Sequence, residues 1–173
     1  MSLSLPPPGP FYPPLTTITY FQPADAVDRL NQILSDIAAA SSKIRLAAYN
    51  LTDATIVDAL IAQFNAGVLD IVIVIDWTQA HLVFEHFSIT KLRAILTPAR
   101  VIYTTSPTAH QQFENNILTI DDAVNWDGTA QWTTEAATRQ STATRTPDTT
   151  LATNNSALID AAAAYGLAHL PQT

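Results

Sequence analysis

The feature that most constrains the fold is an alternation of strand-like and helix-like patterns over residues 17–76. Predicted strands cover residues 17–21, 43–51 and 70–76. The last of these, DIVIVID, is nearly all β-branched, which is typical of a sheet strand buried on both faces. Since strand–helix–strand units make right-handed crossovers, we predict an α/β fold with a mostly parallel central sheet and helices flanking both of its faces.

Two helices are predicted between these strands. The first covers residues 25–40, and its apolar face consists of Val27, Leu30, Ile33, Leu34 and Ile37. The second follows Thr52, which can cap it, and ends at Gly67. The later predicted elements are a helix around residues 90–96, strands at 101–103, 115–120, 123–126 and near 143–151, and a helix over about 156–167. With 173 residues, 47% of them apolar, the chain holds a single domain over residues 17–173.

Residues 1–16 are predicted to form an extended, Pro-rich arm outside that domain. Six of the eleven prolines lie in the first fourteen residues, and each fixes φ and removes an amide donor. The arm also carries four large apolar side chains, Leu3, Leu5, Phe11 and Tyr12, which favours docking on its own domain or on a neighbouring subunit. We expect neither a secretory signal nor a transmembrane segment in the chain, and no compartment is indicated.

The charge of the chain argues against nucleic acid as a partner. The formal net charge is −7, and the eight lysines and arginines are scattered along the sequence. Nucleic-acid binding draws most of its affinity from clustered basic groups that neutralise phosphates, so a nucleic-acid partner is not expected. Because the chain has no cysteine, disulfides and thiolate metal sites are excluded.

Three stretches together indicate a family: YFQPADAVDRLNQIL, YNLTDATIVDALIAQFNAGVLDIVIVID and ILTIDDAVNWDGTAQWTTEA. In order and spacing, from about Thr17 to His169, the chain resembles the single-motif nucleases of the phospholipase D-like superfamily. Members of that family follow an H-x-K-x4-D strand with a turn, a strand and the sequence G-S-x-N-W-T. The matching positions here are Asp121, followed by Gly128, Thr129, Gln131, Trp132 and Thr133. The resemblance implies a phospholipase D-like sandwich fold.

Counting back from Asp121 by the family spacing places Asn116 at the lysine and Glu114 at the histidine, so the motif reads E-x-N-x4-D. In the family, the histidine attacks phosphorus, a second histidine protonates the leaving group, and the lysine neutralises the phosphate oxygens. A carboxylate repels phosphate, and an amide carries no charge. The family's downstream N-x-E-N strand would fall near residues 141–144 and has lost its polar identity. We therefore predict that no residue here is catalytic.

Other candidates for a catalytic or metal-binding role fit ordinary structural roles better. An alternative register makes His110 the nucleophile, but His110 is four residues too far from Asp121, and Gln112 would replace the lysine. A metal site at His81, Glu85 and His86 lacks the i, i+4 spacing of a helical metal pair. Asp76 follows a buried strand at the edge where α/β sheets place functional groups, yet a helix cap or a turn is the favoured role. We interpret Trp77, Trp126 and Trp132 as core or subunit contacts.

These observations favour an inactive phospholipase D-like protein that acts as a structural, self-assembling scaffold. The expected partner is a second copy of the chain, in a homodimer, a larger homo-oligomer or a filament, with no cofactor and no membrane contact. If the family's two-fold dimer is kept, Glu114 and Asp121 of both chains would cluster and share protons or bind a cation. Two alternatives stay open: a phosphodiesterase or nuclease that uses His110 and Asp121, and a non-catalytic module that binds a cation or a neutral sugar in the old phosphate pocket.

Overall fold

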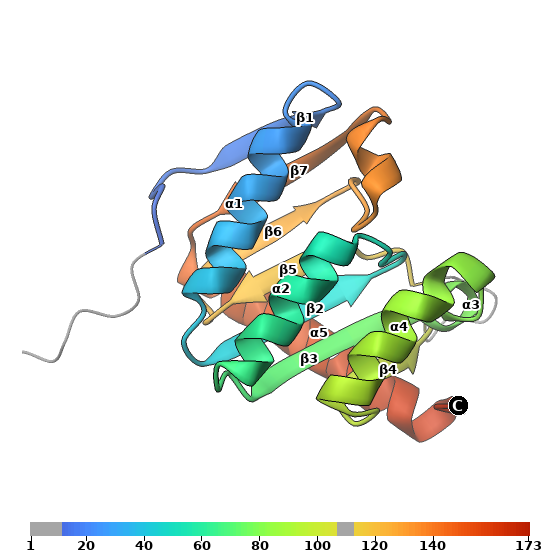
Figure 1. The fold of residues 1–173 in the computed structure, drawn as a ribbon. Coiled ribbons are helices and arrows are strands. Elements are labelled where there is room, and N and C mark those ends of the chain that lie inside the picture. The colour runs from blue at the N-terminus through green and yellow to red at the C-terminus, as the bar shows by residue number, and fades with distance from the viewer. Residues whose placement is uncertain (1–11, 107–112) are drawn as a thin grey trace, which may run out of the picture.

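The computed structural model describes residues 12–106 and 113–173. Its elements, in chain order, are β1 (Ile18–Gln22), α1 (Ala26–Ala39), β2 (Lys43–Ala48), α2 (Ala54–Asn65), β3 (Asp70–Asp76), α3 (Trp77–Ala80), α4 (Val83–Leu96), β4 (Val101–Thr104), β5 (Ile117–Ile120), β6 (Val124–Gly128), the 3-10 helix η1 (Thr134–Ala137), β7 (Ser141–Thr146) and α5 (Thr149–His169). Figure 1 shows that they form one central sheet with helices packed on it.

The sheet has seven strands in the order β1-β7-β6-β5-β2-β3-β4. Only β2–β3 and β3–β4 pair in parallel, and the pairings β1–β7, β7–β6, β6–β5 and β5–β2 are antiparallel. The predicted mostly parallel sheet is therefore wrong, although the α/β class is confirmed. The physical reason lies in the connections. Helical crossovers join β2, β3 and β4, whereas a turn at residues 121–123 joins β5 to β6, and a loop over residues 129–140 that holds only η1 joins β6 to β7, so these pairs are antiparallel.

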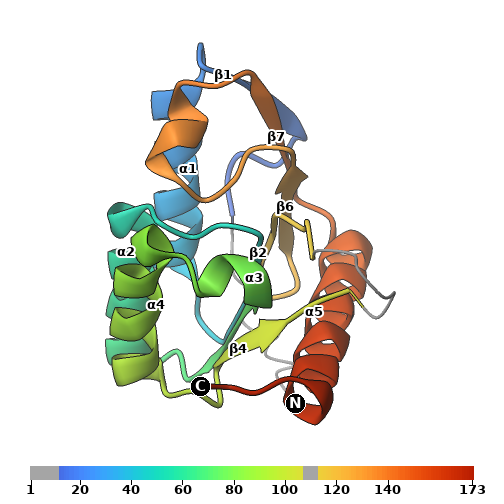
Figure 2. The same ribbon diagram turned by 90° about the vertical axis from the view of Figure 1, so that its right-hand side faces the viewer.

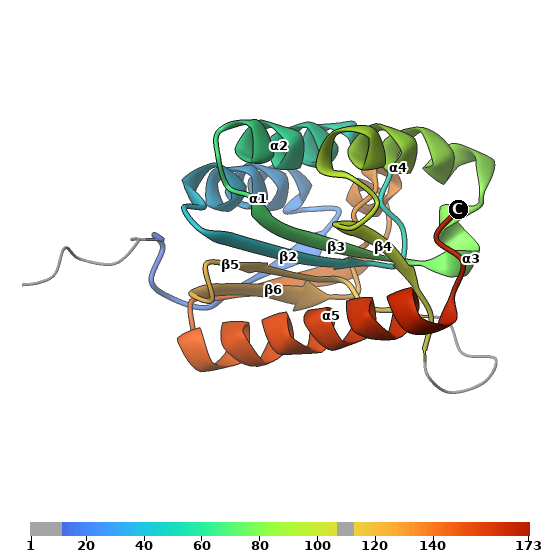
Figure 3. The same ribbon diagram turned by 90° about the horizontal axis from the view of Figure 1, so that it is seen from below.

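Helices cover both faces of the sheet, as predicted. In Figure 3, α1, α2 and α4 lie on one face and α5 lies on the other. The larger core fills the space under the three helices, where Ile33, Leu60 and Leu92 are fully buried. A smaller core under α5 is built from Val74 and Ile159 with their neighbours. β3 and β5 are buried on both faces and read as near-continuous apolar runs, whereas β2 also carries Lys43 and Arg45.

Several local predictions need correction. Val27 is 72% exposed, because it lies outside the buried stripe of α1. The side chain that caps α2 belongs to Asp53, which accepts hydrogen bonds from the amides of the first turn, so Thr52 is not the cap. The strand predicted to reach residue 151 stops at Thr146, and α5 begins much earlier than expected because Asp148 caps it, accepting from the Leu151 amide (2.7 Å).

The described end of the N-terminal arm docks on its own domain. Tyr12 is 4% exposed, and its hydroxyl donates to the Ala39 carbonyl (3.3 Å) and to Asp121. Arg145, which is fully buried, donates to the backbone carbonyls of residues 12, 13 and 14. An extended arm is thus not supported for Tyr12, while Leu3, Leu5 and Phe11 lie outside the described residues.

Arg145 is held in turn by a buried carboxylate. Its guanidinium donates twice to Asp36 (2.7 and 2.8 Å), and the Trp126 indole donates to the same carboxylate (2.8 Å). The side chains of Arg145 and Asp36 are 0% and 2% exposed. This ion pair ties α1, β6, β7 and the chain before β1 together.

None of the described helices has the length and apolar character needed to cross a bilayer.

Candidate functional site

The candidate site lies at one edge of the sheet, meaning the side where strands end and not an outer strand. The carboxyl ends of β2, β3 and β4 meet the start of β5 there, at the right-hand edge in Figure 1. β5 runs antiparallel to β2, with Ala47 beside Ile117, so the residues just before β5 lie next to those just after β2. Glu114 and Asn116 precede β5, and Asn50 follows β2. The edge therefore gathers the two replaced motif positions and one polar residue that the sequence did not single out.

The segment after β6 carries the predicted motif position Gln131 and reaches the same edge. Gly128 has φ of +148°, and a Cβ there would lie 2.2 Å from the Thr142 carbonyl oxygen, so only glycine allows β6 to end so close to β7. The amides of Thr129 and Ala130 both donate to that same carbonyl (2.9 and 3.0 Å). The hydroxyl of Thr129 accepts from the Thr142 amide (3.0 Å). The turn is thereby fixed before the chain enters the site.

Trp132 anchors the rest of this segment. Its indole is 2% exposed and donates to the Ala47 carbonyl on β2 (2.9 Å). Its own carbonyl accepts from the amides of Thr52 and Asp53 (3.0 and 3.1 Å). Thr133 then caps η1 by accepting from the Ala136 amide (3.2 Å). Trp126 and Trp132 are thus core residues, in agreement with their interpretation from the sequence.

Three side-chain amides, those of Asn50, Asn116 and Gln131, lie at this edge of the sheet. Asn50 donates through Nδ2 to Oε1 of Gln131 (3.1 Å), which occupies the asparagine position of the G-S-x-N-W-T motif. The Oδ1 atoms of Asn50 and Asn116 are both buried and accept no hydrogen bond from the described residues. Glu114 is exposed. The edge can accept and donate hydrogen bonds, but its replaced motif positions offer neither a nucleophilic imidazole nor a cation.

A polar hollow of about 630 Å³ opens beside this amide pair. An adjoining recess of about 120 Å³ shares four of its lining residues. The main hollow is lined by Asn50, Thr52, Gln131, Thr133, Thr134, Glu135 and Arg139. Sequence reasoning missed Asn50, Glu135 and Arg139, although the position of Asn50 just past a strand end was a usable signal.

Asp121 does not belong to this edge, because it follows β5 and so lies at the strand's opposite end from Glu114. Its two oxygens accept from the amides of Ser41, Ser42 and Lys43 (2.7–2.9 Å), from both serine hydroxyls and from Tyr12. Burial by itself raises the pKa of Asp121, but these hydrogen bonds outweigh it and lower the pKa to about 2. Glu114 and Asp121 are therefore not brought together in this chain.

The other candidate residues have structural partners. Asp76 is fully buried and caps α3 by accepting from the amides of Thr78 and Gln79 (2.9 and 3.2 Å), while its second oxygen accepts from the Phe113 amide (2.7 Å). The role of helix cap predicted for Asp76 is confirmed. His81 stacks at an angle on Trp77, 4.6 Å between ring centroids. Among the described residues, no group of three potential metal ligands is found. The side chains of Glu85 and His86, and the whole of His110 and Gln112, lie outside the described part of the chain.

The described lysines are engaged away from the amide cluster. Lys43 pairs with Asp122 (3.0 Å) at the opposite end of β5, and Lys91 on α4 pairs with Asp58 on α2 (2.6 Å). His169, near the end of α5, stacks on Tyr165. None of these groups is placed to attack or neutralise a phosphate at Glu114 and Asn116.

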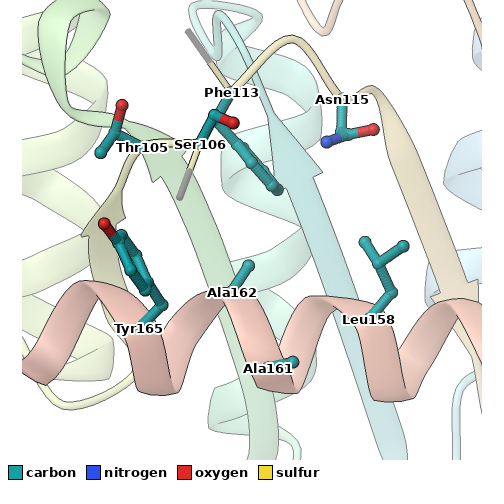
Figure 4. Close-up of a pocket in the computed structure, with 8 residues that line it drawn as sticks. All are labelled: Thr105, Ser106, Phe113, Asn115, Leu158, Ala161, Ala162 and Tyr165. Carbon is teal, nitrogen blue, oxygen red and sulfur yellow. The ribbon is translucent and has the colours of Figure 1, made fainter. Parts of the chain in front are cut away.

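A second hollow, of about 430 Å³, lies on the α5 side of the same edge. Figure 4 shows Leu158, Ala162 and Tyr165 of α5 pointing toward Phe113 and Asn115 across it. It is lined by Thr105, Ser106, Phe113, Asn115, Leu158, Ala161, Ala162 and Tyr165. This lining is mostly apolar and brings together no set of groups for acid–base or nucleophilic chemistry.

Comparisons with known proteins agree with this geometry. The family model described as "Cardiolipin synthase, PLD-like domain" matches residues 33–161. NucT from Helicobacter pylori is similar in structure, with 18% identity, a TM-score of 0.77, and coverage of 87% of this chain and 96% of that one. The phospholipase D family member Nuc from Salmonella typhimurium has 21% identity, a TM-score of 0.73, and coverage of 87% and 95%.

A larger protein shares the same fold over part of its length. Phosphatidylserine synthase from Haemophilus influenzae is 14% identical with a TM-score of 0.69, over 84% of this chain and 36% of that one. At these identities the likeness concerns the fold alone. No curated protein matches the sequence.

Proposed function

The chain belongs to the cardiolipin synthase-type, PLD-like domain family, and from this premise we propose that it is a member that has lost phosphodiester chemistry and serves as a scaffold. The observation that carries the proposal is the identity of the residues before β5. Glu114 and Asn116 stand where the resemblance places the histidine nucleophile and the phosphate-binding lysine. The sheet, the hairpin turn and the Trp132 anchor are all kept, so the fold survives without its chemistry.

Electrostatics supports the absence of catalysis. In the mechanism that the resemblance implies, a neutral imidazole attacks phosphorus and a cation stabilises the charge on the phosphoryl oxygens. Glu114 places an exposed carboxylate at the nucleophile position, where it repels the substrate. Asn116 offers an amide with no charge, and Lys43 and Lys91 are paired with carboxylates elsewhere.

The test of lost catalysis is hydrolysis of bis-(p-nitrophenyl) phosphate and of single- and double-stranded DNA. We expect no turnover above that of the His110→Ala variant, which serves as the matched control for the alternative nucleophile. Hydrolysis by the wild type that disappears in His110→Ala would overturn the proposal and establish the phosphodiesterase alternative. The Glu114→His, Asn116→Lys double variant shows whether the remaining site still supports chemistry once the two groups are restored.

Self-association is the second part of the proposal, and β1 is the surface that supports it. Within the described chain, β1 pairs with β7 along one edge, and its sequence ITYFQ contains no charge. Natural sheets usually protect such edges with lysine, proline or a bulge. α5 packs against β2 to β6, on the opposite side of the sheet from α1, as Figure 2 shows for the two helices. Because the neighbouring Tyr20 points into the core under α1, Phe21 points to the α5 side, beyond the strands that α5 covers, and is 60% exposed. The Phe21 amide already donates to the Asp25 carboxylate (2.7 Å) and the Phe21 carbonyl accepts from the Asp25 amide (2.9 Å). Antiparallel pairing of β1 with β1 of a second copy would therefore use the outward backbone groups before Phe21, and it would join two sheets through one closed, isologous contact.

The expected assembly is therefore a dimer through β1, and its mass is measured by analytical ultracentrifugation with light scattering. Phe21→Lys should give a monomer, because a lysine on an edge strand opposes edge-to-edge pairing. Leu167→Lys, on the exposed end of α5, is the matched control and should leave the dimer intact. A wild-type monomer, or a dimer that persists in Phe21→Lys, would exclude this role of β1.

Deletion of residues 1–11 separates β1 from the arm as the assembly element. Tyr12 and the two prolines after it are kept, because Arg145 binds their carbonyls within the domain. We expect the truncated protein to keep the mass of the wild type. A loss of assembly on truncation would assign self-association to the arm residues Leu3, Leu5 and Phe11 instead.

A further inference from the structure

The polar hollow beside the amide pair has the chemistry of a binding site that the scaffold role does not use. Its walls carry two amides, three threonine hydroxyls, one carboxylate and one guanidinium. One polar atom at this wall has no partner: Oδ1 of Asn50 is buried and accepts no hydrogen bond from the described residues, while its Nδ2 is held by Gln131. A buried acceptor without a donor costs free energy, so a small rotation of the Asn50 amide that brings Oδ1 to a hydroxyl donor of a ligand in the hollow would be stabilised.

The formal charge of the lining is balanced. Glu135 and Arg139 are both exposed at the hollow and carry opposite charges, and its other lining residues are neutral. A phosphate or another anion would meet one cation and one carboxylate, which removes the net attraction that anion sites rely on. A divalent cation would meet a single carboxylate, and no group of three potential metal ligands gathers in the described chain. Both charged classes of ligand are therefore disfavoured.

We propose that this hollow binds a neutral carbohydrate through the amides of Asn50 and Gln131, with Glu135 and Arg139 at its rim. Neighbouring hydroxyls of a sugar ring each offer one donor and two acceptor positions. Amide, carboxylate and guanidinium groups are planar and can engage two adjacent hydroxyls at once, whereas a lone hydroxyl cannot. The volume of about 630 Å³ lies within the range of about 300–1,000 Å³ that is usual for small-molecule sites.

The backbone that carries Gln131 is held in place before any ligand arrives. The backbone carbonyls of Ala130 and Gln131 accept from the guanidinium of Arg29 (3.5 and 3.2 Å), which lies 5.5 Å from the Trp132 ring centroid. Burial lowers the pKa of Arg29 to about 10, which still leaves it charged at neutral pH. The segment that carries Gln131 is thus fixed from below by Arg29 and Trp132. Preorganisation of this kind lowers the entropic cost of binding.

The test is saturation-transfer difference NMR with maltose, cellobiose and glucose as probes, which detects millimolar binding even if the protein assembles. We expect transfer to the ring protons of at least one sugar. Asn50→Ala should weaken that binding by roughly three- to tenfold, the factor that one hydrogen bond of ordinary strength gives. Asn154→Ala, at an exposed position of α5, is the matched control and should bind as the wild type does.

Folding of each variant is checked by the near-ultraviolet circular dichroism of the tryptophans. Arg139→Ala changes an exposed side chain, so it keeps the test valid if Asn50→Ala does not fold, and it should also weaken sugar binding. The proposal is overturned if none of the three sugars shows transfer, or if the Asn50→Ala, Arg139→Ala and Asn154→Ala variants all bind equally. Binding of inorganic phosphate in place of sugar, measured by calorimetry, would overturn it as well.

Discussion

Replacing Asp36 by leucine should destabilise the protein more than any surface change, because it strands a buried cation. The guanidinium of Arg145 is fully buried and has Asp36 as its carboxylate partner, through two hydrogen bonds of 2.7 and 2.8 Å. The Trp126 indole would lose its acceptor at the same time. Removing one partner of a buried ion pair costs about 3–5 kcal/mol. That is a large part of the roughly 5–15 kcal/mol by which a domain of this kind is stable.

A double-mutant cycle measures how much of this cost is electrostatic. Asp36→Leu, Arg145→Met and the double variant are unfolded in urea, and the free energy of unfolding is extrapolated to water. We expect each single variant to lose about 3–5 kcal/mol and the double variant to lose clearly less than the sum, since it leaves no unpaired charge. Lys91→Met, which breaks the exposed pair with Asp58, should cost less than about 1 kcal/mol.

Two results would refute this reasoning. One is a loss below about 1 kcal/mol in Asp36→Leu, which would mean that Arg145 finds water or another partner without penalty. The other is simple additivity of the two single variants in the double variant, which would mean that the pair is not coupled. Arg145→Met also removes the donor that holds the carbonyls of residues 12–14, so limited proteolysis should cut near them faster in that variant.

Three further predictions concern single residues. Asp121 is only partly buried, so after solvent screening its pKa of about 2, against an ordinary 3.8, contributes about 1–2 kcal/mol. That stability is present above pH 3.8 and is lost as the pH falls towards 2, and Asp121→Asn should lack it in urea unfolding at pH 7 and show a flatter acid profile. Burial and contact with Asp121 raise the pKa of Tyr12 above its ordinary value of 10, so its contribution is present below pH 10 and lost above it. Tyr12→Phe should lower stability at pH 7 by about 1 kcal/mol and remove that alkaline loss; an unchanged alkaline profile would count against the docked arm. Gly166→Ala should lower Tm, although alanine normally favours a helix, because its Cβ would lie 2.2 Å from the Tyr103 carbonyl oxygen. The expected cost is roughly 1–3 kcal/mol, and a raised Tm in calorimetry would contradict it.

The first half of the fold was predictable because its elements are specified locally. The apolar periods of α1 and α2 and the β-branched run of β3 each identify one element without reference to the rest of the chain. The direction of β5, β6 and β7 was not predictable in this way. Their apolar patterns suit parallel and antiparallel neighbours equally well. The short gap between the predicted strands 115–120 and 123–126 was the one usable signal, because it is filled by a tight turn with positive φ at Asp121 and Asp122.

The candidate site shows the same division. Glu114, Asn116 and Gln131 could be found by spacing from Asp121, because a motif fixes positions along the chain. Asn50 had its position just past a strand end as the one signal, whereas Glu135 and Arg139 had none, since they lie in the η1 segment and meet Asn50 only when β2 and that segment come together. The cluster of Glu114 with Asp121 was predicted only across a two-fold dimer; within one chain the two residues lie on opposite sides of β5 (Ile117–Ile120).

The sequence by itself determined the family and the helices and strands of the first half, and it predicted the replacement of the histidine and lysine, because all of these depend on residue identity and short-range spacing. Tertiary structure alone decided the mixed sheet, the docking of Tyr12 and the role of Asp121 at the far end of β5. It also decided which polar groups lost water. The burial of Arg145 with Asp36, and of one amide oxygen of Asn50, follows from segments far apart in the sequence packing against each other, and no local pattern encodes that desolvation.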